Sequence, residues 1–138
     1  MRFLWHAAAA AFLAWNVASA QEEVDVCPAS AAAESWLELV DAGRYGESWE
    51  QGAATFKQAI ERVKWEATVQ QARGMVGMLV KRKLRTARHV HNLPNAPEGE
   101  YVVIQNEARF DNRPLASETV TVMRQADGSW RVAGYFIH

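Results

Sequence analysis

The sequence has one cysteine, Cys27, among 138 residues, so it has neither an internal disulfide framework nor a zinc site built from several cysteines. It also has little net charge, with a formal value of −1 at pH 7. That balance argues against a nucleic-acid-binding protein whose affinity comes from net positive charge. No apolar run reaches the roughly 20 residues that a membrane-spanning helix needs. The length favours one domain with one core.

Catalytic motifs are absent as well. The sequence contains no G-x-S-x-G nucleophile elbow, no phosphate-binding Walker loop and no G-x-G-x-x-G dinucleotide motif. Cys27 has no histidine near it in the sequence, so we expect no thiol nucleophile. The sequence alone therefore indicates no reaction and no cofactor.

The first twenty residues, MRFLWHAAAAAFLAWNVASA, have the layout of a secretory signal peptide. Arg2 precedes an apolar stretch over 3–15, and Ala18 and Ala20 form an A-x-A cleavage pattern. The stretch is shorter than a membrane span, and His6 interrupts it. We therefore expect cleavage after Ala20 and a periplasmic or secreted protein with no membrane span. The alternative is an uncleaved N-terminal anchor.

Cleavage removes one basic residue and no acidic one, so 118 residues with a net charge of −2 remain. Cys27 is then an unpaired thiol in an oxidising compartment, within a flexible arm over residues 21–29. We interpret it as a passive thiol, with an intermolecular disulfide as the alternative. Residues 30–138 are expected to form a single domain.

Hydrophobic spacing predicts helices in the first half of that domain. Ser30 is a candidate N-cap for the first helix, and Gly43 suits the left-handed residue after its end. A short helix follows around Tyr45, and the residues from Thr55 have the form of a capping box that starts another. The apolar stripe changes phase near Val63, which predicts a kink or a break there. The stripe residues are Ala33, Trp36, Leu37, Val40, Phe56, Ala59, Ile60, Trp65, Val69, Ala72 and Val76.

From about Val80 the apolar period becomes two, which predicts strands over 81–92, 100–110, 116–124 and 129–137. Turn residues separate these segments, and short connections make consecutive strands antiparallel neighbours. The predicted fold class is therefore α+β, with N-terminal helices packed on one face of a curved four-stranded antiparallel meander sheet.

Polar side chains fall on the face of this sheet that should meet the helices. Asn106 and Glu118 alternate with apolar residues, and if Leu84 of the first strand points inward, so do Arg82 and Arg88. One interpretation is structural, in which Glu118 pairs with an arginine or a bulge carries the arginines out to solvent. The other is a pocket in which Arg82, Arg88, Asn106 and Glu118 hold a ligand.

Two further patterns are similar to functional motifs. The basic run over 81–88 suggests a nucleic-acid patch, but export and the net charge favour a solvated strand face. Contact with an acidic partner or an anionic membrane surface is the alternative. His89 and His91 share the face opposite Arg82 with a spacing that can chelate a metal. Since His138 is the only other histidine after the leader, the sequence predicts exposed histidines and no metal site.

Blocks along most of the chain resemble, in order, a bacterial family known as domain of unknown function 4019. They are AESWLELVDAGRY (33–45), SW (48–49), RKL (82–84), GEYVVIQ (99–105), ETVT (118–121) and DGSWRVAGY (127–135). The resemblance implies a small exported bacterial protein with no assigned activity and no catalytic residues to carry over. The order of elements is also similar to the nuclear-transport-factor-2-like or cystatin-like α+β cone, which implies a pocket without specifying a reaction.

Three functional hypotheses follow. The first is a non-catalytic periplasmic domain that binds a small ligand or an envelope protein. The second is a small lyase, isomerase or hydrolase with a cone pocket built around Glu118 and Arg82 or Arg88. The third is an envelope interaction module that forms a homodimer through a sheet face.

We predict that the protein recovered from the periplasm begins at Gln21. Intact mass spectrometry measures this as the loss of residues 1–20, and a native spectrum of the same sample reports the oligomeric state and any co-purifying ligand. Recovery of the full 138-residue chain from the membrane fraction would contradict cleavage.

Overall fold

A computed structural model describes residues 23–138, so the expected signal peptide lies outside the described residues. No helix within the described part is long and apolar enough to cross a membrane. The elements are α1 (Cys27–Asp41), α2 (Tyr45–Glu50), α3 (Ala54–Ala59), α4 (Arg62–Val76), β1 (Leu79–His91), β2 (Glu100–Phe110), β3 (Arg113–Arg124) and β4 (Trp130–Ile137).

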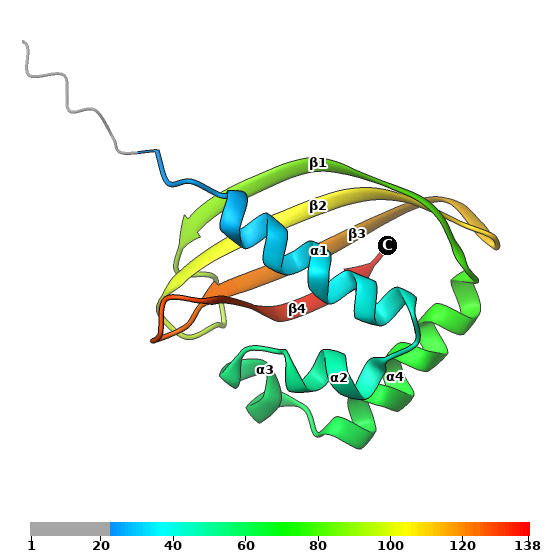
Figure 1. The fold of residues 1–138 in the computed structure, drawn as a ribbon, viewed down its shortest axis with the longest axis horizontal. Helices are drawn as coiled ribbons and strands as arrows, with labels where there is room; N and C mark the ends of the chain where they lie inside the picture. Colours follow the sequence, from blue (N-terminus) through cyan, green and yellow to red (C-terminus); the bar gives the residue numbers. More distant parts are fainter. Residues whose placement is uncertain (1–22) are drawn as a thin grey trace, which may run out of the picture.

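The four strands form one open antiparallel sheet in the order β1-β2-β3-β4, so the predicted α+β class and the meander are confirmed. The predicted bounds of β2 match, and those of the other strands differ by one to three residues. Figure 1 shows α1 lying across the inner face of the curved sheet, with α2, α3 and α4 continuing beyond the β4 edge.

Helix α1 buries the predicted stripe, and it begins earlier than expected. Ala29 joins Ala33, Trp36, Leu37 and Val40 among its buried residues. The helix starts at Cys27 instead of after Ser30, because Pro28 is suited to the first turn and the Asp25 carboxylate accepts the Cys27 backbone N–H at 2.9 Å. Cys27 is therefore exposed in the first helical turn and not in a loose arm.

Of the local signals predicted for the helix ends, the left-handed glycine after α1 is confirmed and the capping box of α3 is not. Gly43 has a φ of +75°, and it and Arg44 donate to carbonyls of the last turn of α1, as predicted for a left-handed end. The capping box is wrong, because Thr55 lies inside α3. The start of α3 is instead fixed from outside, where the Ala53 N–H donates to the Val132 carbonyl of β4 at 2.8 Å. The predicted break lies between α3 and α4, just before Val63.

Strand β1 changes face at Arg85, an extra residue that the register leaves without a partner on β2. Before this β-bulge, Arg82 stands opposite Ala108, which is buried on the inner face. After it, His89 stands opposite Val102, which is also buried. The strand therefore presents even-numbered residues to the core over 82–84 and odd-numbered residues after Arg85, and an earlier register shift at Val80 lets Leu79 face the core at the strand's start.

The bulge overturns the prediction that Arg82 and Arg88 share the inner face. Because one extra residue reverses the alternation of side chains, everything after Arg85 switches sides. Arg82 points inward, whereas Arg88 is exposed on the outer face. His89 and His91, which the sequence placed on the face opposite Arg82, point inward instead.

The main core fills the space between the sheet and the helices, and the tryptophans hold its centre. Trp36 and Trp65 are buried as predicted, and their indole N–H groups donate to the backbone oxygen and the hydroxyl of Ser48, at 2.8 and 2.9 Å. Trp49 and Trp130 are half-buried at the margin of the core. A second, smaller cluster at the far end of the sheet consists of Val76, Ala108, Phe110 and Ala116.

Candidate functional site

The four residues predicted to line one pocket occupy three different environments. Glu118 is fully buried, Asn106 is nearly so, and Arg88 lies on the outer face. Arg82 bridges two of these environments, because it pairs with Glu118 and also lines a surface cleft together with Asn106. The structure therefore brings three of the four residues to one region and excludes Arg88.

Arg82 is the centre of a partly buried ionic network. Its guanidinium donates to both oxygens of Glu118, at 2.6 and 3.1 Å, and to both oxygens of Asp41, at 2.7 and 3.0 Å. Arg73 of α4 donates to Asp41 at 2.9 Å. The hydroxyl of Tyr135 in β4 donates to Glu118. Two guanidinium groups thus neutralise two carboxylates contributed by separate elements.

Burial and charge act against each other in this network. Burial opposes ionisation of Asp41, but hydrogen bonds from Arg82 and Arg73 and their positive charges outweigh it and hold the pKa of that carboxyl below its ordinary 3.8. Burial, reinforced by the charge of Glu118, raises the pKa of Tyr135, so the phenol stays protonated and remains a donor. For Arg82, the two carboxylates outweigh burial and raise its pKa, which fixes the positive charge.

The network fits the structural interpretation of the inward polar residues. The Glu118 side chain is 0% exposed, and both of its oxygens accept hydrogen bonds, so it has no free lone pair directed at solvent. A substrate would reach this carboxylate only after Arg82 moved away. Both structural alternatives hold together, since Glu118 pairs with one arginine and a bulge carries the other outward.

Two surface clefts flank α1. The first, which we call the α1–β1 cleft, has a volume of about 280 Å³ and contains Arg82 and Asn106. Two glutamates from α1, Glu34 and Glu38, face it, and the Arg82 charge is already matched by the network. The remaining lining residues are Ser30, Ala33, Leu37, Leu84 and Ile104.

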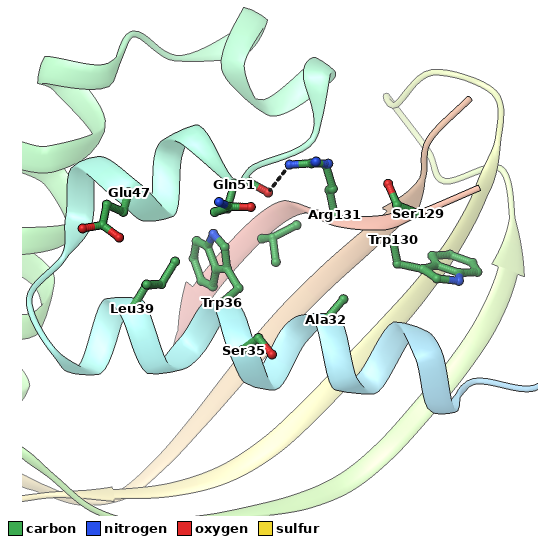
Figure 2. A pocket seen from close by; sticks show the side chains of 10 residues that line it. Ala32, Ser35, Trp36, Leu39, Glu47, Gln51, Ser129, Trp130 and Arg131 are labelled. Carbon is green, nitrogen blue, oxygen red and sulfur yellow. Dashed lines mark hydrogen bonds between the residues drawn. The ribbon is translucent and has the colours of Figure 1, made fainter. Parts of the chain in front are cut away.

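The second, which we call the α1–β4 cleft, lies between α1, α2 and the start of β4 and has a volume of about 380 Å³. Figure 2 shows it running along α1 from Glu47 to Trp130, with Trp36 between them. Apolar side chains supply most of its wall. The lining residues are Ala32, Ser35, Trp36, Leu39, Glu47, Gln51, Ser129, Trp130, Arg131 and Val132.

The two charged side chains of the α1–β4 cleft, Glu47 and Arg131, differ in whether a salt bridge neutralises them. Glu47 pairs with Arg44 outside the cleft. Arg131 is half-buried and makes one long hydrogen bond, at 3.5 Å, to the Gln51 carbonyl. Within residues 23–138 no carboxylate forms a salt bridge with it. The charge of Asp127 interacts with Arg131 from beyond salt-bridge distance. The cleft thus offers an apolar wall with one cation that no salt bridge engages.

Sequence reasoning missed this cleft because it joins residues almost a hundred positions apart. The only local signal is the turn at Asp127 and Gly128, which predicts where the last strand starts. The turn does not predict whether the first residues of β4 lie beside α1. That depends on the direction in which α1 crosses the sheet, which no local sequence pattern specifies.

The two histidines of β1 lie close together, with ring centroids 4.7 Å apart. Glu100 of β2 stands opposite His91, and one ligand atom from each of the three side chains lies within 4.8 Å of the others. Sequence reasoning missed Glu100 as a member of this group. The available signal was the hairpin itself, because His91 and Glu100 flank the 92–99 loop.

Comparison with known proteins supplies a family and a fold. Residues 32–135 match the family model described as "Protein of unknown function (DUF4019)". No curated protein matches the chain. A solved structure from Catenulispora acidiphila is similar over 79% of this chain and 86% of that chain, with a TM-score of 0.51 and 10% sequence identity. At that identity the likeness shows the fold alone.

We predict that Arg82→Met destabilises the protein by about 3–5 kcal/mol, because it leaves the Glu118 carboxylate buried without its cation. Arg88→Met is the matched control: the same substitution, six residues along the same strand, should stay within about 0.5 kcal/mol of the wild type. Urea unfolding measures both. Equal losses in the two variants would show that the network does not hold the fold together.

We predict that Asp41→Asn costs about 1–3 kcal/mol at pH 7. Because the pKa of Asp41 is lowered in the folded protein, its contribution is complete above the ordinary 3.8 and is lost as the pH falls through the lowered value. The difference between wild type and variant should therefore shrink below about pH 4, as measured by urea unfolding from pH 7 to pH 3. A difference that stays constant to pH 3 would contradict ionic pairing of Asp41.

Proposed function

The chain belongs to the DUF4019 family, and from that starting point we propose that it is an exported, non-catalytic protein that binds a small molecule in the α1–β4 cleft. The ligand we infer has an apolar body and one anionic group. The observation that carries this proposal is Arg131, which forms no salt bridge among the described residues, at an otherwise largely apolar wall.

The size and chemistry of the cleft support a small ligand. Its volume of about 380 Å³ falls within the roughly 300–1,000 Å³ typical of small-molecule pockets, which combine apolar walls with a few directed polar groups. The half-buried Trp130 provides aromatic surface against which a flat body can pack, and the edge of the buried Trp36 lines the wall beside it. Ser35 and Gln51 add hydrogen-bonding groups along the same wall.

The charge of the ligand follows from Arg131. A guanidinium presents donors in a planar fork that matches a carboxylate, sulfonate or phosphate, and such charge-assisted bonds are among the strongest a site can offer. Since Glu47 pairs with Arg44 and Arg131 forms no salt bridge within the described residues, the Arg131 guanidinium is available to pair with an anionic group of a ligand.

The competing hypotheses have less support from the geometry. The enzyme hypothesis needs Glu118 as a base, but that carboxylate is fully buried and both oxygens are engaged. The homodimer hypothesis needs an apolar sheet face, whereas the outer face around β1 and β2 carries exposed Lys83, Arg88 and Arg109. The export part of the proposal rests on the signal-peptide pattern of residues 1–20 and is tested by the mass of the mature chain.

Filling the cleft should abolish ligand binding. The probe is 1-anilinonaphthalene-8-sulfonate, a flat apolar anion whose fluorescence rises on binding. We expect Ala32→Phe, which inserts a ring into the cleft, to weaken its binding at least tenfold. Ala31→Phe is the matched control, because Ala31 is the preceding residue of α1, is exposed and does not line the cleft. Wild-type protein that does not bind the probe, or equal effects of the two variants, would overturn the proposed site.

The same titration tests the role of Arg131. Arg131→Gln should weaken binding of the sulfonated probe about tenfold, the loss of roughly 1.4 kcal/mol expected for one charge-assisted contact. N-phenyl-1-naphthylamine has the same body without the sulfonate, so its binding should not change. An equal effect on both compounds would show that Arg131 shapes the cleft and does not select an anion.

A further inference from the structure

The end of the β1–β2 hairpin brings two histidines and a glutamate to one face of the sheet. The Asn92 N–H donates to the Gly99 carbonyl, and the Gly99 N–H donates to the Asn92 side chain, both at 3.0 Å. These bonds close the base of the loop and set His91 directly opposite Glu100. His89 lies two residues earlier on the same strand, so all three side chains share the inner face.

The donor atoms of this group are close and largely uncommitted. One ligand atom from each of His89, His91 and Glu100 lies within 4.8 Å of the others. Among the described residues neither imidazole makes a hydrogen bond, and the Nε2 atom of His89 is buried without a partner. Glu100 uses one carboxylate oxygen, Oε2, to accept from Arg124 at 3.0 Å, which leaves Oε1 available.

Two imidazole nitrogens and one carboxylate oxygen suit zinc, copper and nickel, whereas magnesium and calcium prefer oxygen ligands alone. Zinc sites with three protein ligands complete a tetrahedron with water. Bond lengths of about 2.0–2.1 Å place such donors roughly 3.4 Å apart, so these side chains must close by up to about 1.4 Å. His91 is exposed and the Glu100 side chain is 32% exposed, so both can rotate.

We propose that His89, His91 and Glu100 form a binding site for a divalent transition metal such as Zn²⁺, with water in the remaining position. The bound ion links the end of β1 to the start of β2 and stabilises the hairpin end of the sheet. Arg124 engages only Oε2 of Glu100, so Oε1 can bind the metal whether or not this ion pair forms. This site is separate from the cleft of the proposed function, and either can exist without the other.

The test is titration of the untagged full chain with Zn²⁺ by calorimetry and by thermal unfolding. We expect one ion per chain and, with zinc at about one hundred times its dissociation constant, a rise in melting temperature of about 10 °C. Mg²⁺ at the same concentration should give neither effect. Failure of the wild-type protein to bind zinc, or an equal response to Mg²⁺, would overturn the proposal.

Variants locate the site. His91→Ala and Glu100→Gln should each weaken zinc binding at least tenfold, while far-UV circular dichroism confirms that they fold. Arg124→Gln is the matched control for Glu100→Gln, because both break the same ion pair and only one removes a ligand. It should retain most of the zinc affinity.

Two further variants exclude other donors in the chain. Cys27→Ser and His138→Ala remove the thiol and the C-terminal histidine and should bind zinc as the wild type does. The assignment fails if His91→Ala and Glu100→Gln bind normally, if the Cys27 or His138 variant loses binding, or if Arg124→Gln loses as much affinity as Glu100→Gln.

Discussion

The buried carboxylate of Glu118 is the group around which the described structure is arranged. An ionised carboxylate taken out of water costs several kcal/mol unless a cation and hydrogen bonds replace the solvent. Arg82 supplies the cation from β1, and Tyr135 supplies a further donor from β4. Arg82 also binds Asp41, the last residue of α1. The guanidinium that neutralises Glu118 therefore also attaches the end of α1 to the sheet.

This network sits between the two apolar clusters and contacts both. The ring of Tyr135 packs edge-on against Trp36 in the main core, at 5.3 Å between centroids. The guanidinium of Arg73 lies over the ring of Phe110 in the smaller cluster, at 5.0 Å. The crossing of α1 over the sheet is therefore set by its buried apolar stripe and by the ion pairs at its end. One helix is narrower than the four strands beneath it, so a cleft remains on each side.

Periodic patterns predicted the elements well, and single-residue events limited the prediction of the site. The buried stripe of α1 and the bounds of β2 follow from spacing alone, because burial of a whole face constrains many residues together. Arg88 was misplaced because one bulge residue, Arg85, reverses the rest of its strand. Ser30 and Thr55 looked like caps, but a preceding carboxylate and a contact with β4 set those helix starts. No propensity encodes either contact.

The two ends of the sheet have different physical roles. Glu118 and Arg82 lie toward one end, where both carboxylate oxygens of Glu118 and of Asp41 already accept hydrogen bonds within the network. At the other end, Arg124 stands opposite Trp130 of the α1–β4 cleft in the β3–β4 register, and its guanidinium reaches Glu100 beside the histidines. Half-exposed aromatic, cationic and metal-ligating groups thus gather where the network does not reach. Substitutions there leave the Arg82 network in place, so binding and the stability that the network supplies can be tested separately.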